Sequence, residues 1–147
     1  MNSVDFLLTG GIVVTMDRQW NVYDPGAVAV RGREIIAVGP ADEISAEYTA
    51  RETWSCTDQV ILPGLINAHH HLYSTFARGF RPPGPPATNF EETLRNLWWK
   101  LDKALDEDDV YYSALLAIMH AARAGCTTII DHHASPSCVD GSLDQVE

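Results

Sequence analysis

Cysteine and basic residues are both scarce in this chain of 147 residues. The three cysteines, Cys56, Cys126 and Cys138, are odd in number and none is spaced as C-x-x-C, so no disulfide framework is expected. Reduced thiols predict a cytoplasmic protein. Only 10 residues are Lys or Arg against 20 Asp or Glu, and the formal net charge is -10. Because there is no basic patch, we expect binding neither to nucleic acid nor to an anionic membrane surface.

Long apolar runs are also missing. No segment approaches the roughly 18 apolar residues of a membrane-spanning helix, and the opening MNSVDFLLTGG carries no positive side chain ahead of its apolar residues. We therefore expect neither a membrane anchor nor a signal peptide. Hydrophobic residues still make up 46% of the chain, which is enough to bury a core.

Residues 1–58 are predicted to form a small β module. The stretch DFLLTGGIVVTMD contains two apolar runs separated by a glycine pair, and each run is expected to be a strand. Two more strands are expected at 27–30 and 35–38, joined as a hairpin by the polar turn RGRE. The polar segment 41–52 has room for one helical turn.

Residues 59–147 begin with QVILPGLINAH, an apolar stretch typical of a strand covered on both faces of a parallel sheet. Pro63 cannot donate to a ladder, so strand pairing is expected from about Leu65 onward. A proline-rich loop at 81–89 and then helices follow, before a second strand with the sequence CTTIID. The order strand, loop, helices, strand predicts an α/β protein with a parallel sheet.

Signals for helix ends lie between these two strands. Asn89 with Glu92 three residues later matches a capping box, and Asp106 can cap a second helix. The stretch VYYSALLAIMHAARAG in the second helix is apolar on nearly all sides, so this helix is predicted to be largely buried. Gly125 is expected to end it.

Three consecutive histidines, His69, His70 and His71, end the first of these strands. Side chains alternate along a strand, so His69 and His71 face one side and His70 faces the other. Two imidazoles at this spacing can bind one metal ion, at the end of a parallel strand where α/β folds hold their ligands. The H-x-H spacing alone is a weak motif, and solvated imidazoles at a strand end are the alternative.

The second strand ends in a comparable group, Asp131, His132 and His133. The carboxyl ends of parallel strands meet at one edge of a sheet, so His132 and His133 are predicted at the rim of the same site. Asp131 either orients a neighbouring imidazole or caps the following loop. His120, in the apolar helix, is interpreted as a packed or surface histidine.

Longer stretches around these histidines resemble the amidohydrolase superfamily. The signature P-G-x-x-x-x-H-x-H is met by Pro63, Gly64, His69 and His71, and it follows the stretch GREIIAVGP. The stretches NLWWKLDKALDEDDVYYSALL and GCTTIIDHHASP are most similar to the SsnA-like aminohydrolases, in the branch that holds deaminases and chlorohydrolases. The resemblance covers essentially the whole chain.

This resemblance implies a (β/α)8 barrel beside a small β-sandwich. Residues 1–58 would be the N-terminal part of the sandwich, and residues 59–147 the first β/α units of the barrel. It implies that His69 and His71 bind a divalent metal ion, zinc in the first place and iron as the alternative. The implied reaction is hydrolysis of a non-peptide carbon–nitrogen bond, the deamination of a small heterocycle by metal-activated water.

Two positions depart from the pattern of related enzymes. Guanine and triazine deaminases often have glutamine where this chain has Ser74, which puts a guanine-like substrate in doubt. Dihydroorotase-like relatives have arginine where this chain has Tyr73, which argues against an acidic cyclic amide. Arg78 is interpreted either as an anion-binding residue or as a surface arginine. The predicted substrate-binding residues are Tyr73, Ser74, Arg78, His132 and His133.

Chain length sets a further expectation. A closed barrel takes about 250 residues and catalytic zinc needs three protein ligands. This chain is therefore too short to close the barrel and is predicted to be the N-terminal part of a longer enzyme, inactive alone, with the proton-shuttling residue beyond residue 147. It is expected to need the remainder of the barrel or a second copy of itself. Two other interpretations stay open: a non-catalytic metal-chelating or interaction fragment, and a cyclic-amide hydrolase of the same fold.

Overall fold

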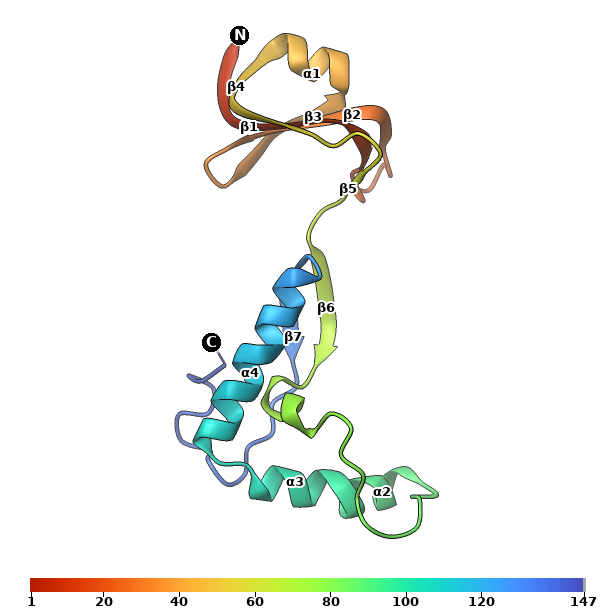
Figure 1. The fold of residues 1–147 in the computed structure, drawn as a ribbon, viewed down its shortest axis with the longest axis vertical. Coiled ribbons are helices and arrows are strands. Elements are labelled where there is room, and N and C mark those ends of the chain that lie inside the picture. The colour runs from red at the N-terminus through yellow and green to blue at the C-terminus, as the bar shows by residue number, and fades with distance from the viewer. Residues whose placement is uncertain (147) are drawn as a thin grey trace. The chain divides into compact units, whose positions relative to one another are not determined.

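The computed structural model describes residues 1–146, whose elements are drawn in Figure 1. The chain forms two compact units that divide between Pro63 and Gly64. This division falls later than the boundary after residue 58 that the sequence suggests, because Val60 and Ile61 pair with the first strand of the chain. No helix within residues 1–146 is long and apolar enough to cross a membrane.

The first unit is built on a mixed sheet with the strand order β3-β2-β1-β4, in which β5 also pairs with β1. Its strands are β1 (Asn2–Val14), β2 (Val22–Arg31), β3 (Glu34–Pro40), β4 (Tyr48–Ser55) and β5 (Val60–Ile61). The predicted hairpin is confirmed, since β2 and β3 are antiparallel with Arg31 opposite Glu34. In contrast, β4 and β5 run parallel to β1.

The first strand corrects one expectation. The two apolar runs around the glycine pair form the single strand β1 rather than two strands. The register of β1 against β2 shifts on both sides of Gly11, and Gly10 has a φ of 86°. The glycine pair is therefore accommodated as a β-bulge, because glycine reaches positive φ without the strain that a side chain brings.

The helix α1 (Ala41–Glu47) covers one face of this sheet. Ile44 of α1 is buried against the strands in a cluster that contains Val4, Leu7, Ala27, Ala29 and Ile44. Val28 and Val30 alternate with the two alanines along β2 and line a separate apolar hollow of about 250 Å³. The first unit thus has a small core on one side and an open apolar surface on the other.

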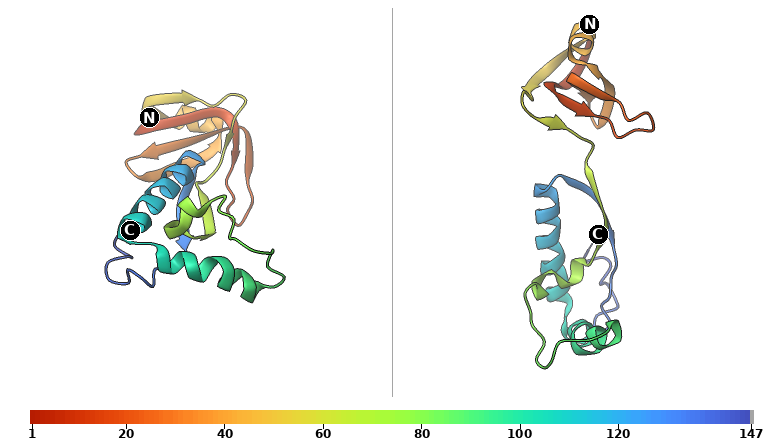
Figure 2. Two further views of the ribbon diagram at one scale, coloured as in Figure 1. Left: turned by 60° about the horizontal axis from the view of Figure 1, so that its bottom comes forward. Right: turned by 90° about the vertical axis from the view of Figure 1, so that its right-hand side faces the viewer.

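The second unit contains a two-stranded parallel sheet, β6 (Leu65–His70) and β7 (Cys126–Asp131). The helix α4 (Glu107–Arg123) lies alongside both strands in the two views of Figure 2. Leu72, Ala114 and Ala117 form its buried cluster, and Ile129 of β7 packs against them. Strand pairing from Leu65 onward is confirmed, as is the mixed α/β character of the chain.

The helical segment before α4 contains a π-helical turn. In order along the chain lie α2 (Phe90–Thr93), the π-helical turn Leu94–Trp98 and α3 (Trp99–Ala104). The side chain of Asn89 caps this segment by accepting a hydrogen bond of 2.9 Å from the backbone N–H of Glu92. The Glu92 carboxylate accepts from the backbone and hydroxyl of Thr88 instead of closing the expected box, and these bonds lower the pKa of Glu92.

The ends of α4 match the sequence signals, but its burial does not. Asp106 and Asp109 form a reciprocal capping box, and Gly125 follows the helix with a φ of 77°. The expectation of a largely buried helix is wrong, since Tyr112 and Met119 are 53% and 55% exposed. The described residues of the second unit cover one side of α4 only, the side that carries Val110, Ser113, Ala114 and Ala117.

Candidate functional site

His69 and His71 stand at the carboxyl end of β6, on either side of its last residue. Their Nε2 atoms lie 3.3 Å apart, and their rings meet edge to face with an interplanar angle of 83°. His69 is exposed and His71 is half-buried. The two nitrogens therefore point toward one common position at the end of the strand.

A backbone carbonyl from the second strand segment holds the ring of His71. Its Nδ1 atom lies 2.8 Å from the carbonyl oxygen of His132. A carbonyl only accepts hydrogen bonds, so this contact places the proton on Nδ1 and leaves the Nε2 lone pair free. The ring of His132 also stacks on that of His69, with centroids 4.2 Å apart.

This pair of imidazoles fits a divalent metal ion. Tetrahedral zinc with Zn–N bonds of about 2.0–2.1 Å sets neighbouring nitrogen ligands roughly 3.3–3.4 Å apart. The observed separation of 3.3 Å between the Nε2 atoms agrees with this requirement. Within residues 1–146, no group of three or more His, Cys, Asp or Glu side chains gathers closely enough to hold a metal ion.

His70 takes no part in the contact between His69 and His71. Its ring is half-buried, and its Nδ1 atom makes no hydrogen bond with the described residues. Its backbone carbonyl accepts a hydrogen bond of 2.8 Å from the N–H of His132, which continues the pairing of β6 with β7. His70 therefore contributes to the strand ladder through its backbone.

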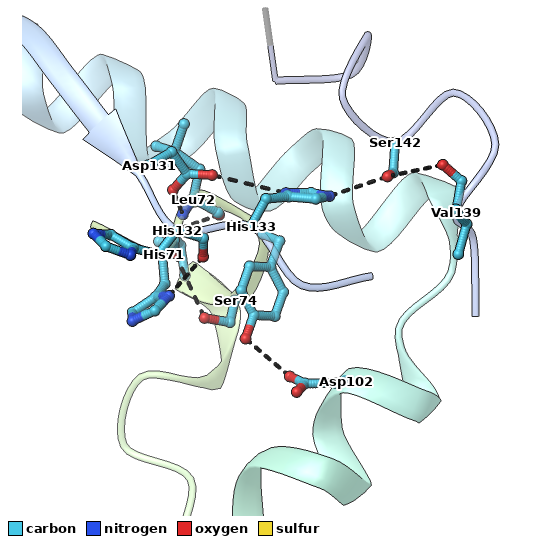
Figure 3. A network of polar contacts seen from close by, with 11 residues as sticks. His71, Leu72, Ser74, Asp102, Asp131, His132, His133, Val139 and Ser142 are labelled. Atoms are coloured by element: carbon cyan, nitrogen blue, oxygen red, sulfur yellow. Dashed lines mark hydrogen bonds and ion pairs between the residues drawn. The ribbon is translucent and has the colours of Figure 1, made fainter. Parts of the chain in front are cut away.

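Asp131, the last residue of β7, joins the two strand ends (Figure 3). Its Oδ1 atom accepts a hydrogen bond of 2.8 Å from the backbone N–H of Leu72, the residue that follows His71. Its Oδ2 atom lies 3.7 Å from Nδ1 of His133. Asp131 thus caps the 3₁₀ helix Leu72–Ala77 on the neighbouring chain segment, and not the loop that follows Asp131 itself.

His132 and His133 come from the same strand end but have different surroundings. His132 is exposed beside His69, in line with its predicted place at the rim. The side chain of His133 is only 13% exposed, and its Nε2 atom lies 3.1 Å from Oγ of Ser142. The Ser142 hydroxyl in turn donates to the carbonyl of Val139. His133 is therefore enclosed in a polar network.

Of Tyr73, Ser74 and Arg78, only Tyr73 brings its side chain against the histidines, with its ring centroid 6.0 Å from that of His71 and 5.7 Å from that of His133. The Tyr73 side chain is buried, and its hydroxyl donates a hydrogen bond of 2.9 Å to Oδ1 of Asp102 in α3. Burial, reinforced by that carboxylate, raises the pKa of Tyr73 well above its ordinary value. Ser74 is also buried, whereas Arg78 is exposed at the end of the 3₁₀ helix. Contact of these residues with a substrate stays a prediction.

Two residues near the site are not among those that the sequence predicts. The ring centroid of Trp98 lies 5.8 Å from that of His71, and Asp102 binds Tyr73. Trp98 fits an apolar helical stripe, and that pattern predicts a core residue. The adjacent Trp99 could have indicated that one of the two tryptophans lies outside the core, because neighbours along a helix cannot both face the same core. No pattern in the sequence indicates a role for Asp102.

Comparison with known proteins shows which family this chain matches. The model of the amidohydrolase family matches residues 60–147. A 5-methylthioadenosine/S-adenosylhomocysteine deaminase of Syntrophobacter fumaroxidans is 40% identical over 127 residues, which cover 86% of this chain and 28% of the relative. The corresponding deaminase of Pelotomaculum thermopropionicum is 26% identical over 96% of this chain and 32% of the relative. The chain thus spans about three tenths of the relatives it matches.

Solved structures agree with the family match. A zinc-bound adenosine deaminase of Xanthomonas campestris superposes with a TM-score of 0.77 at 29% identity, over 89% of this chain and 29% of that one. The guanine deaminase of E. coli superposes with a TM-score of 0.72 over 95% of this chain and 33% of that one, and at 14% identity it shows the fold alone. The chain described here belongs to the amidohydrolase family.

Proposed function

We propose that this chain is part of a metal-dependent hydrolase that deaminates a small nitrogen heterocycle. His69 and His71 are proposed as two ligands of one divalent metal ion. The observation that carries the proposal is the 3.3 Å separation of their Nε2 atoms. The fixed tautomer of His71 supports it, because the proton on Nδ1 leaves the ring nitrogen nearest His69 able to bind a metal.

The two units are predicted from the sequence as residues 1–58 and 59–147, and they divide in the structure after Pro63. We further propose that the first is the N-terminal part of a β-sandwich and the second the first β/α units of a barrel. The length of the relatives supports this proposal, since this chain matches 28% of the Syntrophobacter fumaroxidans deaminase. Catalytic zinc takes three protein ligands, so the remaining ligands and the proton-shuttling residue would come from the rest of the parent protein. The three cysteines are free thiols, which supports a cytoplasmic location.

The residues of this chain would have distinct tasks in the reaction. A bound divalent ion supplies Lewis-acid chemistry, which polarises the substrate and lowers the pKa of water. His69 and His71 hold that ion, and the carbonyl of His132 keeps the His71 ring in the required tautomer. Trp98 and Tyr73 flank His71 with aromatic rings, and their bulk would keep solvent away from that side of the site.

The proposed substrate class is an amino-substituted aromatic heterocycle. The similar proteins include deaminases of adenosine and of 5-methylthioadenosine/S-adenosylhomocysteine, all of which contain an adenine base. The half-buried ring of Trp98 offers a planar surface beside His71 on which such a base could stack. Zinc is the proposed ion, in line with the zinc bound to the Xanthomonas campestris enzyme. Iron remains the alternative.

The metal content of the parent protein tests this function. His69→Ala and His71→Ala should each abolish stoichiometric zinc, measured by inductively coupled plasma mass spectrometry, together with ammonia release from adenine nucleosides. His120→Ala is the matched control, because His120 is an exposed histidine of α4 away from the strand ends. Unchanged zinc in either ligand variant would remove the metal assignment. Intact zinc binding without any turnover in the native protein would favour the non-catalytic alternative.

A further inference from the structure

Asp131, the last residue of β7, and His132, which follows it, each form a hydrogen bond with one of the two residues that follow β6. Asp131 accepts from the N–H of Leu72, and the carbonyl of His132 holds Nδ1 of His71, each at 2.8 Å. We infer that Asp131 is a positioning residue for His71, which fixes the backbone of this metal ligand through Leu72. This inference rests on the proposed function and adds a role for a side chain that would not touch the metal ion.

The place of His71 in the backbone explains why such a residue is needed. His71 is the N-cap of the 3₁₀ helix Leu72–Ala77, but its side chain makes no capping hydrogen bond. A helix start leaves backbone N–H groups without partners, and the His71 ring cannot satisfy one while it is aimed at a metal ion. Asp131 supplies the missing acceptor from across the sheet. The His71 ring is thereby released for metal binding.

The surroundings of Asp131 make its contact with Leu72 strong. The Asp131 side chain is only 16% exposed, so its charge-assisted hydrogen bond is weakly screened by water. Its second oxygen, Oδ2, is buried and makes no hydrogen bond with the described residues. Burying a carboxylate oxygen that has no hydrogen bond, and only the Nδ1 atom of His133 at 3.7 Å, is costly. The cost is explained if the first oxygen has a positional task that a neutral residue performs less well.

Loss of the hydrogen bond between Asp131 and Leu72 should weaken binding of the metal ion, because that bond positions His71. Without Asp131, the first residue of the 3₁₀ helix loses its acceptor, and the His71 backbone gains freedom to rotate. Partners that orient metal ligands typically contribute about 10–100-fold to metal affinity or activity. Asp131→Ala is therefore expected to weaken zinc binding by about 10–100-fold. Asp131→Asn keeps an oxygen acceptor but loses the charge, so we expect a loss of roughly two- to tenfold.

The experiment uses the parent protein with Zn²⁺ and Co²⁺ as probes. The zinc dissociation constant is measured by competition with a chelator, and the visible spectrum of the Co²⁺-substituted protein reports the ligand geometry. Ser142→Ala is the matched control, because it removes a hydrogen bond at the His133 end of the same network without touching Leu72. We expect altered Co²⁺ spectra in both Asp131 variants and native behaviour in Ser142→Ala.

The outcomes separate this inference from the function on which it rests. Zinc retained by His71→Ala would overturn the proposed function itself. Zinc lost from His71→Ala, together with native affinity in Asp131→Ala and Asp131→Asn, would overturn the positioning role alone. Equal weakening by Ser142→Ala would also overturn it, since the effect would then be a general loosening of the segment. If Asp131→Ala does not fold, unchanged zinc affinity and Co²⁺ spectrum in Asp131→Asn still refute the inference.

Discussion

At the scale of single residues, the backbone carbonyl and the side chain of His132 make different contributions to the site. The carbonyl oxygen of His132 fixes the tautomer of His71, whereas its imidazole stacks on the ring of His69. The carbonyl belongs to the backbone and survives any side-chain substitution. The two contributions of His132 can therefore be separated by mutation.

We predict that His132→Ala keeps its zinc. The His71 tautomer stays fixed by the backbone carbonyl, and only the stacking on His69 is lost. Because His132 is predicted to bind substrate at the rim, the KM should rise while the zinc content stays near that of the native protein. Elemental analysis and steady-state kinetics of the parent enzyme check this. Loss of the metal ion from His132→Ala would mean that the imidazole itself is a ligand.

The sequence predicts the facing pair of histidines but not the neighbouring Trp98. Alternation along a strand is a local rule, so the sequence alone is enough to put His69 and His71 on one side of β6. The approach of Trp98 depends on a π-helical turn that changes the phase of the helix. A period of 3.6 residues assigns Trp98 to the core, and no local pattern in the sequence announces such a turn.

At the scale of elements, the close approach of Gly64 to β7 explains the glycine of the signature. A Cβ atom at Gly64 would lie 2.7 Å from Cβ of Thr127 and closer still to the branch atoms of that side chain. Leu65, the next residue, donates a hydrogen bond of 2.9 Å to the carbonyl of Gly125. The start of β6 thus depends on contact with the start of β7.

We predict that Gly64→Ala destabilises the second unit by about 1–3 kcal/mol, the usual cost of overpacking. Unfolding by denaturant, followed by circular dichroism, measures the change. Thr127→Gly removes the opposing side chain, so the double variant should be more stable than the sum of the two single effects predicts. Additive effects in this cycle would show that the methyl group added at position 64 does not clash with the Thr127 side chain.

Local signals predict the ends of elements better than their burial. Asp106 and Gly125 bound α4 as expected, because caps and positive φ angles depend on a few adjacent residues. The glycine pair in β1 predicts a turn between two strands but forms a β-bulge. Turns and bulges both need residues at positive φ, which glycine reaches without strain. Burial of α4 depends on what packs against it, and that is decided by distant segments.

At the scale of the whole molecule, α4 presents an apolar stripe on its outer side. Tyr112, Leu115 and Met119 are three and four residues apart and are 53%, 42% and 55% exposed. Such a stripe is unusual on an isolated soluble protein. Since the chain matches 28% of the Syntrophobacter fumaroxidans relative, the rest of the parent protein is the proposed cover.

We predict that residues 1–147 self-associate when they are produced alone. Sedimentation velocity should show species larger than the 16.2 kDa monomer. Leu115→Lys with Met119→Lys should restore the monomer, because charges on the stripe oppose apolar contact. Thr49→Lys with Thr53→Lys adds the same charge to exposed positions of β4 and serves as the control. A monomeric unmodified chain would refute this prediction.

The hydrogen bond between His71 and the carbonyl of His132 also has a consequence for the order in which the site forms during synthesis. The carbonyl that sets the His71 tautomer lies 61 positions further along the chain. At ribosomal rates of about 5–20 residues per second, those positions take roughly 3–12 s to appear. Throughout that interval His69 and His71 have been synthesised, but the carbonyl of His132 that binds the His71 ring has not. The tautomer that leaves Nε2 of His71 free for a metal ion is therefore fixed only after β7 has joined β6.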